Sequence, residues 1–488
     1  MLPLTESICP LSVLPPKHSP SSMLRRHLQS AAIRAVVTAT ACAARNLSGV
    51  ASGLFKANSL LRGTNATLPW TGTGAAPVDR CIPACACAEE TADVSVQLAL
   101  KAQATGTFGV GGLMLANNGG YVIQTMLNDV NRQTKYPAVP GEVCVYDSTA
   151  HVERQLCEWY WANKTTLGLP EPKDVTIVTT LDPCVMCAGS ILASGFNVGV
   201  VALDPTAGVN AYKNNFVSMP ACVQPGLRQF FGYYSILANA NAGVAARSYS
   251  GGTNISFSGS SCTANSCSSC SNAIMDTLDA VKTNCQASGL DPKTNPFVDP
   301  NTVASLKTYF KQMCPAAFSI PNKQRQPSTT LVTAMKNLVS ATPGAKNACA
   351  LIDYYGNLMH MTVDTFSVSP IHTSLMNLIQ QYSKARYALV NNYGPYAGYA
   401  ARHSYTTPMY GTIVYLNAPD INDVTTFKDL GLYGSANEGT TQAGSLQYVN
   451  GDATALTKAI AGLPPLYNAS QPWSANIRFT KASPYTPA

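Results

Sequence analysis

The sequence predicts an α/β layered fold, with helices packed on a β-sheet, and a weaker second copy of the same pattern further along the chain. Three observations carry this prediction. Strand-like and helical segments alternate from Val94 to residue 202, which is the order that α/β layers require. A compact set of His, Glu and Cys residues falls at two of the helix starts. The same order of elements then recurs between residues 329 and 436.

The first copy opens with a short helix that begins at Val94 and stops at Gly106. Two apolar strands, 112–116 and 121–125, flank an Asn- and Gly-rich turn, a pattern that is typical of a β-hairpin. The remaining elements are predicted from apolar periodicity and β-branched runs. They are a helix over 151–163, a strand over 175–179, a helix over 184–194 and a strand over 198–202.

With 488 residues the chain has room for more than one domain. An apolar fraction of 46% supports packed cores rather than a disordered chain. Shifts in composition divide the chain into six predicted segments. These are a leader or targeting segment (1–45), a Cys-containing linker (46–92), the first α/β domain (93–247), a Ser- and Cys-rich irregular segment (248–328), the second copy (329–460) and a tail (461–488).

The net charge of +7 does not by itself point to nucleic acid. Residues 93–247 hold 9 Lys or Arg against 10 Asp or Glu, so the first α/β domain is close to neutral. Phosphate backbones are bound by clustered basic side chains, and this segment has no such cluster. No apolar run of about 18 residues occurs in the chain, so no membrane-spanning helix is expected.

The N-terminal segment has the composition of a targeting sequence. From Met23 it combines a charged start, an apolar stretch and small residues at its end, as secretory signals do. We therefore predict a secreted or periplasmic protein. Arg34 interrupts the apolar stretch, so an Arg-rich organelle transit peptide stays open as the alternative.

The chain contains 16 cysteines. Several of them are bunched, namely Cys81, Cys85, Cys87, Cys262, Cys267, Cys270 and Cys285. In an oxidising compartment such bunches favour disulfides. Cys267 and Cys270 also have the spacing of zinc ligands, so a second metal site is the alternative. Because no further pair with that spacing follows them, disulfides are the preferred interpretation.

One motif carries chemistry. His151 and Glu153 are followed by Pro183, Cys184 and Cys187, with 29 residues between Glu153 and Pro183. The pattern H-x-E with P-C-x-x-C is the signature of zinc deaminases. A catalytic zinc takes three protein ligands and keeps a fourth position open. The imidazole of His151 and the two thiolates supply those three. Glu153, two residues beyond the His, is then the general acid–base rather than a ligand.

Longer segments make the resemblance closer than a motif. Asp147–Glu153, Thr180–Gly189, Thr107–Gly109 and Asp204–Gly208 resemble the tRNA adenosine deaminase and guanine/cytosine deaminase branch of the cytidine deaminase-like superfamily. The similarity covers roughly residues 93–215. It implies bound Zn²⁺, a mixed five-stranded sheet between layers of helices, and sites that often lie at dimer interfaces.

The same resemblance implies residues that contact the substrate. Members of this branch use an Asn shortly before the zinc His, and Asn131 matches that place best, with Asn128 next. Phe108 and Ala150 lie in the matching segments and are expected to contact the substrate as well.

The second copy lacks the metal ligands in the register that its pattern suggests. His372 starts the corresponding helix, but Ser374 stands where the first copy has its Glu. Asp420 and Asp423 stand where the first copy has its two cysteines. We therefore predict a degenerate deaminase-like repeat. The alternative is an unrelated α/β domain whose order of elements coincides with that of the first.

A repeat freed from catalysis is expected to serve as a partner surface. We predict that residues 329–436 pack against 93–215 as an intrachain pseudo-dimer, with a homodimer as the other arrangement that the family allows. Such a partner would lend a residue, His372 or Tyr415, to the pocket of the first copy.

These features predict a zinc-dependent hydrolase that deaminates a free nucleobase or nucleoside and releases ammonia. A base-editing deaminase that acts on RNA, of the tRNA adenosine type, or on single-stranded DNA is the first alternative. A secreted binding protein that keeps zinc only for stability is the second, and the intact Glu153 speaks against it.

Overall fold

The computed structural model describes residues 84–117, 121–133, 143–204, 206–211, 215–234, 272, 304–323, 326–353, 355–392, 412–418, 420–436, 446–450, 461–464 and 477–479. These residues belong to one compact unit, Trp70–Ala488. The predicted leader, the linker before residue 84 and the bunched cysteines at 262–285 lie outside the described residues.

The first copy forms a five-stranded mixed sheet with the strand order β2-β1-β5-β6-β7. Its strands are β1 (Gly111–Ala116), β2 (Tyr121–Leu127), β5 (Val175–Thr179), β6 (Asn197–Val200) and β7 (Phe231–Tyr233). β1 runs antiparallel to β2 and β5, whereas β5, β6 and β7 are parallel. The predicted hairpin, the mixed sheet and the α/β fold class are thereby confirmed.

Three main helices cover this sheet: α3 (Ala84–Ala104), α4 (Val152–Leu167) and α5 (Val185–Ser194). Helix α3 begins well before Val94, inside the segment predicted as a linker, because its first turns are rich in the helix-forming residues Ala and Glu. Smaller elements are the ribbon of β3 (Asn131–Gln133) with β4 (Val143–Val145), and helix α6 (Gln224–Phe230).

The two faces of the sheet bury alternate residues of the same strands. Leu113, Leu115 and Val178 pack with Ala92 and Val96 of α3. Their neighbours Met114 and Ile177 belong instead to the core that contains α4 and α5. This alternation follows from the two-residue period of a strand, and it explains why both β1 and β5 are buried at every position.

The second copy forms a sheet with the strand order β12-β11-β10-β8-β9. Its strands are β8 (Ala348–Ile352), β9 (Leu358–Val363), β10 (Thr412–Asn417), β11 (Leu446–Asn450) and β12 (Ile477–Phe479). Their directions match those of the first sheet strand for strand, and both hairpins shift register within their first strand, β1 or β8. The matching topology agrees with a repeat, while descent by duplication stays a prediction.

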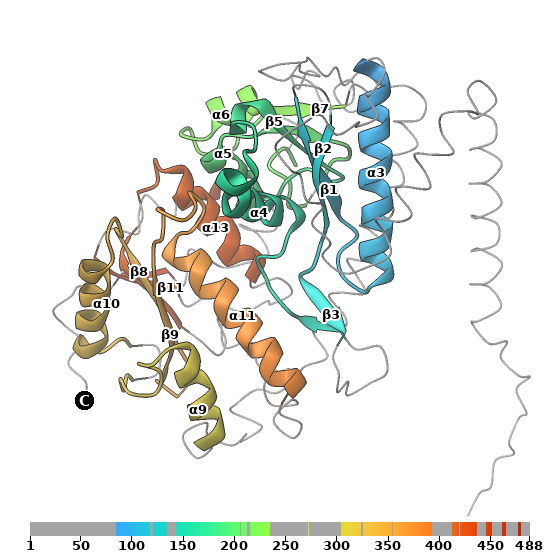
Figure 1. Cartoon of the computed structure of the whole chain (residues 1–488). Coiled ribbons are helices and arrows are strands. Elements are labelled where there is room, and N and C mark those ends of the chain that lie inside the picture. Colours follow the sequence, from blue (N-terminus) through green and yellow to red (C-terminus); the bar gives the residue numbers. More distant parts are fainter. Residues whose placement is uncertain are drawn as a thin grey trace, which may run out of the picture. The chain divides into compact units, whose positions relative to one another are not determined.

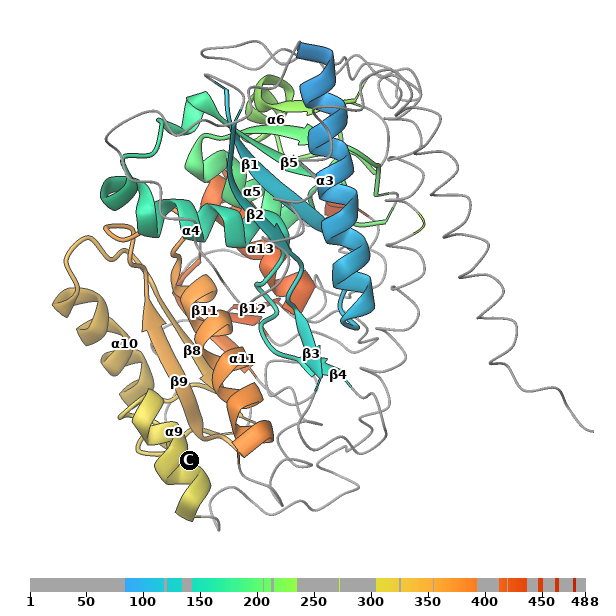
Figure 2. The same cartoon turned by 45° about the vertical axis from the view of Figure 1, so that its right-hand side comes forward.

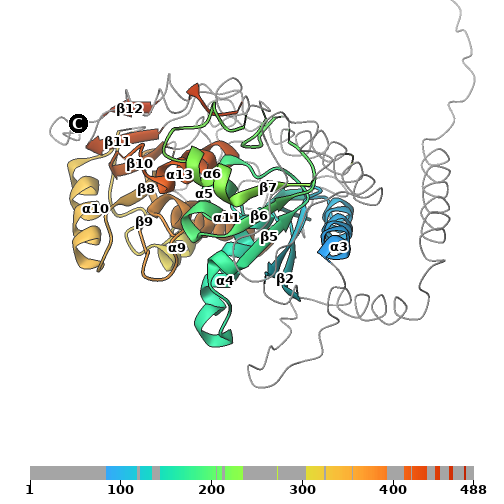
Figure 3. The same ribbon diagram turned by 90° about the horizontal axis from the view of Figure 1, so that it is seen from above.

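Helices of both copies share one core. Helix α10 (Thr329–Ala341) covers the far face of the second sheet, and α11 (Ser374–Asn392) and α13 (Val424–Ala436) cover the near face. Figures 1 and 2 show α4, α5, α11 and α13 between the two sheets, and Figure 3 shows α3 and α10 on opposite outer sides. Helix α9 (Ala304–Met313) lies within the segment predicted to be irregular.

The closest approach between the copies is the crossing of α5 and α13. A Cβ added to Gly189 would lie 2.7 Å from the Cα of Lys428, and one added to Gly431 would lie 2.1 Å from the backbone nitrogen of Met186. The two helices therefore meet backbone to backbone, and glycine on each side permits this. The predicted packing of the second copy against the first is thus present within this chain.

Six cysteines whose side chains the structure describes are free thiols. Outside the zinc set these are Cys157, Cys222, Cys314 and Cys349, none of which belongs to the bunched cysteines, so disulfides in the bunches stay a prediction. Within the described residues, no helix is both long and apolar enough to cross a membrane.

Candidate active site

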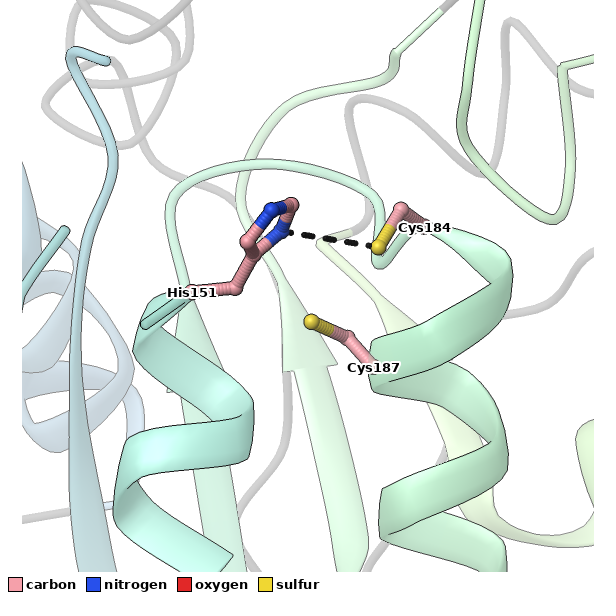
Figure 4. Close-up of side chains that lie close together, drawn as sticks. All are labelled: His151, Cys184 and Cys187. Atoms are coloured by element: carbon pink, nitrogen blue, oxygen red, sulfur yellow. Dashed lines mark hydrogen bonds between the residues drawn. The ribbon is translucent and has the colours of Figure 1, made fainter. Parts of the chain in front are cut away.

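The three predicted zinc ligands come together where α4 and α5 begin. His151 directly precedes α4, Cys184 directly precedes α5, and Cys187 lies on the first turn of α5. Their ligand atoms all lie within 4.8 Å of one another, and Cys184 Sγ is 3.6 Å from His151 Nδ1 (Figure 4). Among the described residues this is the one group of His, Cys, Asp and Glu side chains placed to hold a metal ion.

The donor set fits zinc, which prefers thiolate and imidazole in tetrahedral sites. Cys187 and Cys184 are both buried. A hydrogen bond from Cys187, aided by the charge of His151, holds the pKa of Cys184 well below its ordinary value. Burial and the neighbouring thiolate raise the pKa of Cys187. The protein alone thus favours a single thiolate, and a bound dication would favour both.

Glu153 is the second residue of α4 and is 3% exposed. Thr179, at the end of β5, donates a hydrogen bond from Oγ1 to Glu153 Oε1 at 2.6 Å. Burial raises the pKa of Glu153, and the Thr179 bond only partly opposes this. A raised carboxyl pKa suits a group that must both accept and return a proton near neutral pH.

The sequence did not single out the buried contacts of Asp182, which precedes Pro183 and the zinc helix. Asp182 accepts hydrogen bonds from Tyr233 Oη at 2.6 Å and from the Asn210 backbone nitrogen at 2.9 Å. Burial raises the pKa of Asp182 to about 8. A Cβ on Gly208 would lie 2.3 Å from Asp182 Oδ2, so the loop after β6 packs directly on this carboxyl. In the sequence, the one sign of this contact is that Asp204–Gly208 resembles the matching loop of the deaminase branch.

On the substrate side, the predicted contacts lie in one hydrogen-bonded group. Thr107 Oγ1 donates to Asn128 Oδ1 and accepts from the Asn131 backbone nitrogen. The Ala150 carbonyl accepts from the Asp129 backbone nitrogen. Phe108 is also buried.

Asn131 stands out in this group because it is 2% exposed and neither atom of its side-chain amide has a hydrogen-bond partner among the described residues. A buried amide without a partner is costly, which makes Asn131 the natural group to bind a polar ligand. The assignment of Asn131, Phe108 and Ala150 as substrate contacts stays a prediction.

The aromatic residues that follow the zinc ligand on α4 belong to the core. Tyr160 is fully buried, stacks edge-on against Phe196 and donates to the Pro170 carbonyl. Trp161 donates from Nε1 to Ser194 Oγ, and Trp159 packs against the same core. These rings hold α4 on the domain.

Corresponding contacts fix the register between the copies. The fourth residue of α4, Gln155, donates to the carbonyl of Leu127 at the end of β2. The fourth residue of α11, Asn377, donates to the carbonyl of Val363 at the end of β9.

The residue that takes the place of His151 is therefore Thr373, and the residue that takes the place of Glu153 is Leu375. The predicted register, with His372 and Ser374, was wrong by one residue, because sequence pattern alone cannot fix where a helix begins.

In the second copy, Thr373 contacts a buried ion pair on α13. Thr373 Oγ1 donates to Asp429 Oδ1 at 2.6 Å, and Lys428 Nζ lies 3.0 Å from that carboxylate and donates to Thr373 Oγ1 at 2.8 Å. Tyr415 donates to Asp429 Oδ2, so it does not serve the first copy's pocket. Lys428 is 0% exposed.

Asp420 and Asp423, the predicted replacements for the cysteines, accept hydrogen bonds from their own turn, at Asn422 and Thr425. The carboxylate that meets Thr373 is that of Asp429, one to two helical turns further along. The second copy therefore brings a buried ammonium, and no thiolates, to this position.

Comparison with known proteins assigns the domain. Residues 85–203 match the family model described as "Cytidine and deoxycytidylate deaminase zinc-binding region". No curated protein matches the chain. One similar solved structure comes from a study of A-to-I editing by tRNA deaminases at the wobble position of transfer RNA. It is 21% identical and has a TM-score of 0.19, with 25% of this chain and 77% of that chain covered.

Two further structures are of NE0047. A mutant of NE0047 with 8-azaguanine is 16% identical, covers 43% of this chain and 99% of its own, and has a TM-score of 0.24. NE0047 with 2,6-diaminopurine is also 16% identical, covers 38% and 82%, and has a TM-score of 0.20. These scores are too low to add to the family match. The family match thus covers residues 85–203, and it is to a cytidine and deoxycytidylate deaminase zinc-binding region.

Proposed function

We propose that the first copy hydrolytically deaminates a free nucleobase or nucleoside. The observation that carries this proposal is the buried Glu153 carboxyl, bonded to Thr179 and set beside the His151, Cys184 and Cys187 cluster. A zinc held only for structure requires a fourth ligand and no adjacent acid. The site instead offers three ligands and a carboxyl with a raised pKa.

His151, Cys184 and Cys187 would hold the zinc, which when bound lowers the pKa of water toward about 7 and so supplies a nucleophile at neutral pH. The carbon–nitrogen bond to the exocyclic amine of the base breaks, and a carbon–oxygen bond to the attacking water forms. Glu153 would carry one proton from the water to the ring nitrogen, and a second proton from the newly formed hydroxyl to the amine, which leaves as ammonia while the carbonyl forms. The Thr179 hydrogen bond keeps one Glu153 oxygen fixed while this happens.

Asn131 supports a small, polar substrate. Its buried amide has donor and acceptor atoms without partners among the described residues, and both are complementary to the edge of a base. The pairing of Asn131's backbone with Thr107 would hold that amide in place before the substrate arrives. Aromatic residues on α4, which could otherwise stack a strand of nucleic acid, pack within the core.

A screen for ammonia release tests the proposal. The zinc-loaded full chain should be assayed with guanine, cytosine and adenine, with their nucleosides, and with short RNA and single-stranded DNA oligonucleotides. Turnover of a base or nucleoside is the expected result. Turnover restricted to an oligonucleotide would replace the proposed substrate class with a nucleic acid. No turnover of any of these substrates would overturn the deaminase assignment itself.

A further inference from the structure

Helix α11 of the second copy contacts the first copy at the segments that precede the zinc ligand. Lys384 Nζ lies 3.4 Å from Asp147 Oδ2. Arg386 donates to the Val145 carbonyl at 3.2 Å. Asp147 and Val145 belong to the stretch that leads from β4 into His151 and α4.

Tyr387 extends this contact to the ribbon that carries Asn131. Its hydroxyl donates to the Gln133 carbonyl at 2.7 Å, and its ring packs edge-on against Tyr146 with centroids 5.2 Å apart. The guanidinium of Arg132 lies 3.5 Å above the Tyr146 ring. Both strands of the short ribbon, β3 and β4, are therefore held by the same turn of α11.

A buried ionic network continues from these contacts toward the zinc ligand. Asp147 is 1% exposed and accepts from both the backbone and the hydroxyl of Thr149. Arg154 lies 3.7 Å from Asp147 and donates from Nε to the Thr149 carbonyl at 2.6 Å. The loop of residues 147–150, which ends at His151, is thus fixed from both sides.

The start of α11 adds a second cross-copy contact. His372 Nε2 lies 2.7 Å from Glu158 Oε2, and Glu158 in turn meets Arg154 Nη1 at 3.4 Å. Burial acts to raise the pKa of Glu158, but the His372 bond and the Arg154 charge outweigh it and lower that pKa. His372 therefore contacts the first copy through α4 rather than through the zinc ligands.

We propose that Lys384 and Tyr387 of α11 are positioning residues for substrate binding in the first copy. Through Asp147 and Gln133 they hold the 147–150 loop and the β3–β4 ribbon, which carry Ala150 and Asn131. The second copy thereby completes the substrate side of the site. This inference rests on the proposed deaminase function.

The physical basis is preorganisation. Fixing the backbone of a mobile residue costs about 1–2 kcal/mol. When the loop is already ordered in the free protein, substrate binding does not have to supply that free energy. Loss of the Lys384 and Tyr387 contacts, which together form the brace, should therefore weaken substrate binding more than it slows the chemical step. Glu153 and the zinc ligands are held by other contacts, such as the Thr179 hydrogen bond.

The test uses the zinc-loaded full chain and the substrate found in the ammonia screen. Lys384→Met keeps most of the side chain and removes its charge, and Tyr387→Phe keeps the ring and removes the hydroxyl. Each variant should raise KM about fivefold while kcat and zinc content stay within about twofold of wild type. Lys384→Arg should restore KM. Lys336→Met, at an exposed position on α10, is the matched control and should change neither constant.

Amide hydrogen exchange gives a readout that does not depend on activity. Peptides covering residues 128–133 and 145–151 should exchange faster in Lys384→Met and Tyr387→Phe than in wild type or Lys336→Met. Faster exchange in a chain that deaminates none of the substrates in the screen would support the brace and contradict only the proposed function. Unchanged exchange with unchanged KM would overturn the brace. A fall in kcat at constant KM would mean a merely structural contact, and would overturn it too.

Discussion

The two copies have the same fold but bury different sets of polar and charged side chains. In the first, two thiols and an imidazole meet between the starts of α4 and α5, where they could hold a metal ion. In the second, the residue in the place of His151 is Thr373, and Lys428 brings its own cation to the Asp429 carboxylate. A polar interior position on this fold must be charge-balanced, and a metal ion or an ammonium can supply that balance.

The comparison also shows that the catalytic groups lie in the first copy, whereas the second copy offers it a packing surface. Leu375 occupies the place that Glu153 has in the first copy, so the second copy has no acid–base residue there. Its α13 nevertheless packs backbone to backbone against the zinc helix. Among the described residues, the second copy thus offers no group of metal ligands and still packs closely against the zinc helix.

The largest expected effect comes from the metal. We expect one zinc ion per chain, and complete loss of turnover on its removal by a chelator, because the first copy holds the one group of metal ligands found among the described residues. Cys187→Ser should lose zinc, whereas Cys222→Ser, at an exposed free thiol, should keep it. Metal analysis after dialysis is the measurement. Two equivalents per chain would contradict the contrast between the copies and point to Cys267 and Cys270, which lie outside the described residues.

Glu153→Gln should lower kcat by at least about 100-fold, the usual scale of general acid–base catalysis. Zinc content and the thermal midpoint should change little, since the amide is isosteric and can still accept from Thr179. Glu171→Gln is the control, because that carboxylate is 62% exposed and pairs with Lys164 on the surface. Normal turnover in Glu153→Gln would mean that another group carries the proton.

In the second copy, Lys428→Met should destabilise the fold by about 3–5 kcal/mol, because it leaves the buried Asp429 carboxylate without its counter-ion. The double variant with Asp429→Leu should recover much of this loss. Lys336→Met, at an exposed lysine of the same copy, is the control. Denaturant unfolding measures the effect. A loss below about 1 kcal/mol for the single variant would show that the Asp429 carboxylate does not depend on Lys428 for charge balance.

The crossing of α5 and α13 gives a smaller effect. In Gly431→Ala the new Cβ would meet the backbone nitrogen of Met186 at 2.1 Å, and a backbone atom cannot rotate away. We expect a loss of about 1–3 kcal/mol and faster zinc release from the adjoining ligand helix. Gly226→Ala meets only the end of the flexible Leu192 side chain and should be mild. Equal effects of the two substitutions would argue against a tight crossing.

The smallest effect concerns pH. Burial lowers the pKa of His360, on β9 of the second copy, to about 4 despite its hydrogen bond to Gln381. Between about pH 6.5 and pH 4, the His360 imidazole is therefore protonated in the unfolded chain and neutral in the folded chain. Stability from this group is complete above pH 6.5 and declines as pH falls through that window, by about 2 kcal/mol at pH 5.

Urea unfolding at pH 7 and pH 5 measures this decline. His360→Gln should flatten the pH dependence, because glutamine does not titrate. An unchanged slope in the variant would mean that His360 does not contribute to the acid sensitivity of the second copy.

Local pattern determined much of this protein. In the first copy, the hairpin, the strand at 175–179 and the helix starts at His151 and Cys184 follow from periodicity and residue spacing within short windows. The zinc set and its adjacent carboxyl were likewise predictable, because ligands on one helix turn have a fixed spacing. The order of the strands followed from the resemblance, and the structure agrees with it.

Only the tertiary structure decided what the second copy holds and how it serves the first. Lys428 and Asp429 are adjacent charged residues on an otherwise ordinary helix, and nothing local marks them as buried. Lys384 finds Asp147 across more than two hundred positions of chain, so no window of sequence contains both. Such pairs are fixed by how two sheets and four helices pack. Burial makes Lys428 and Asp429 depend on each other for charge balance, whereas the partly exposed Lys384 pairs with the buried carboxylate of Asp147.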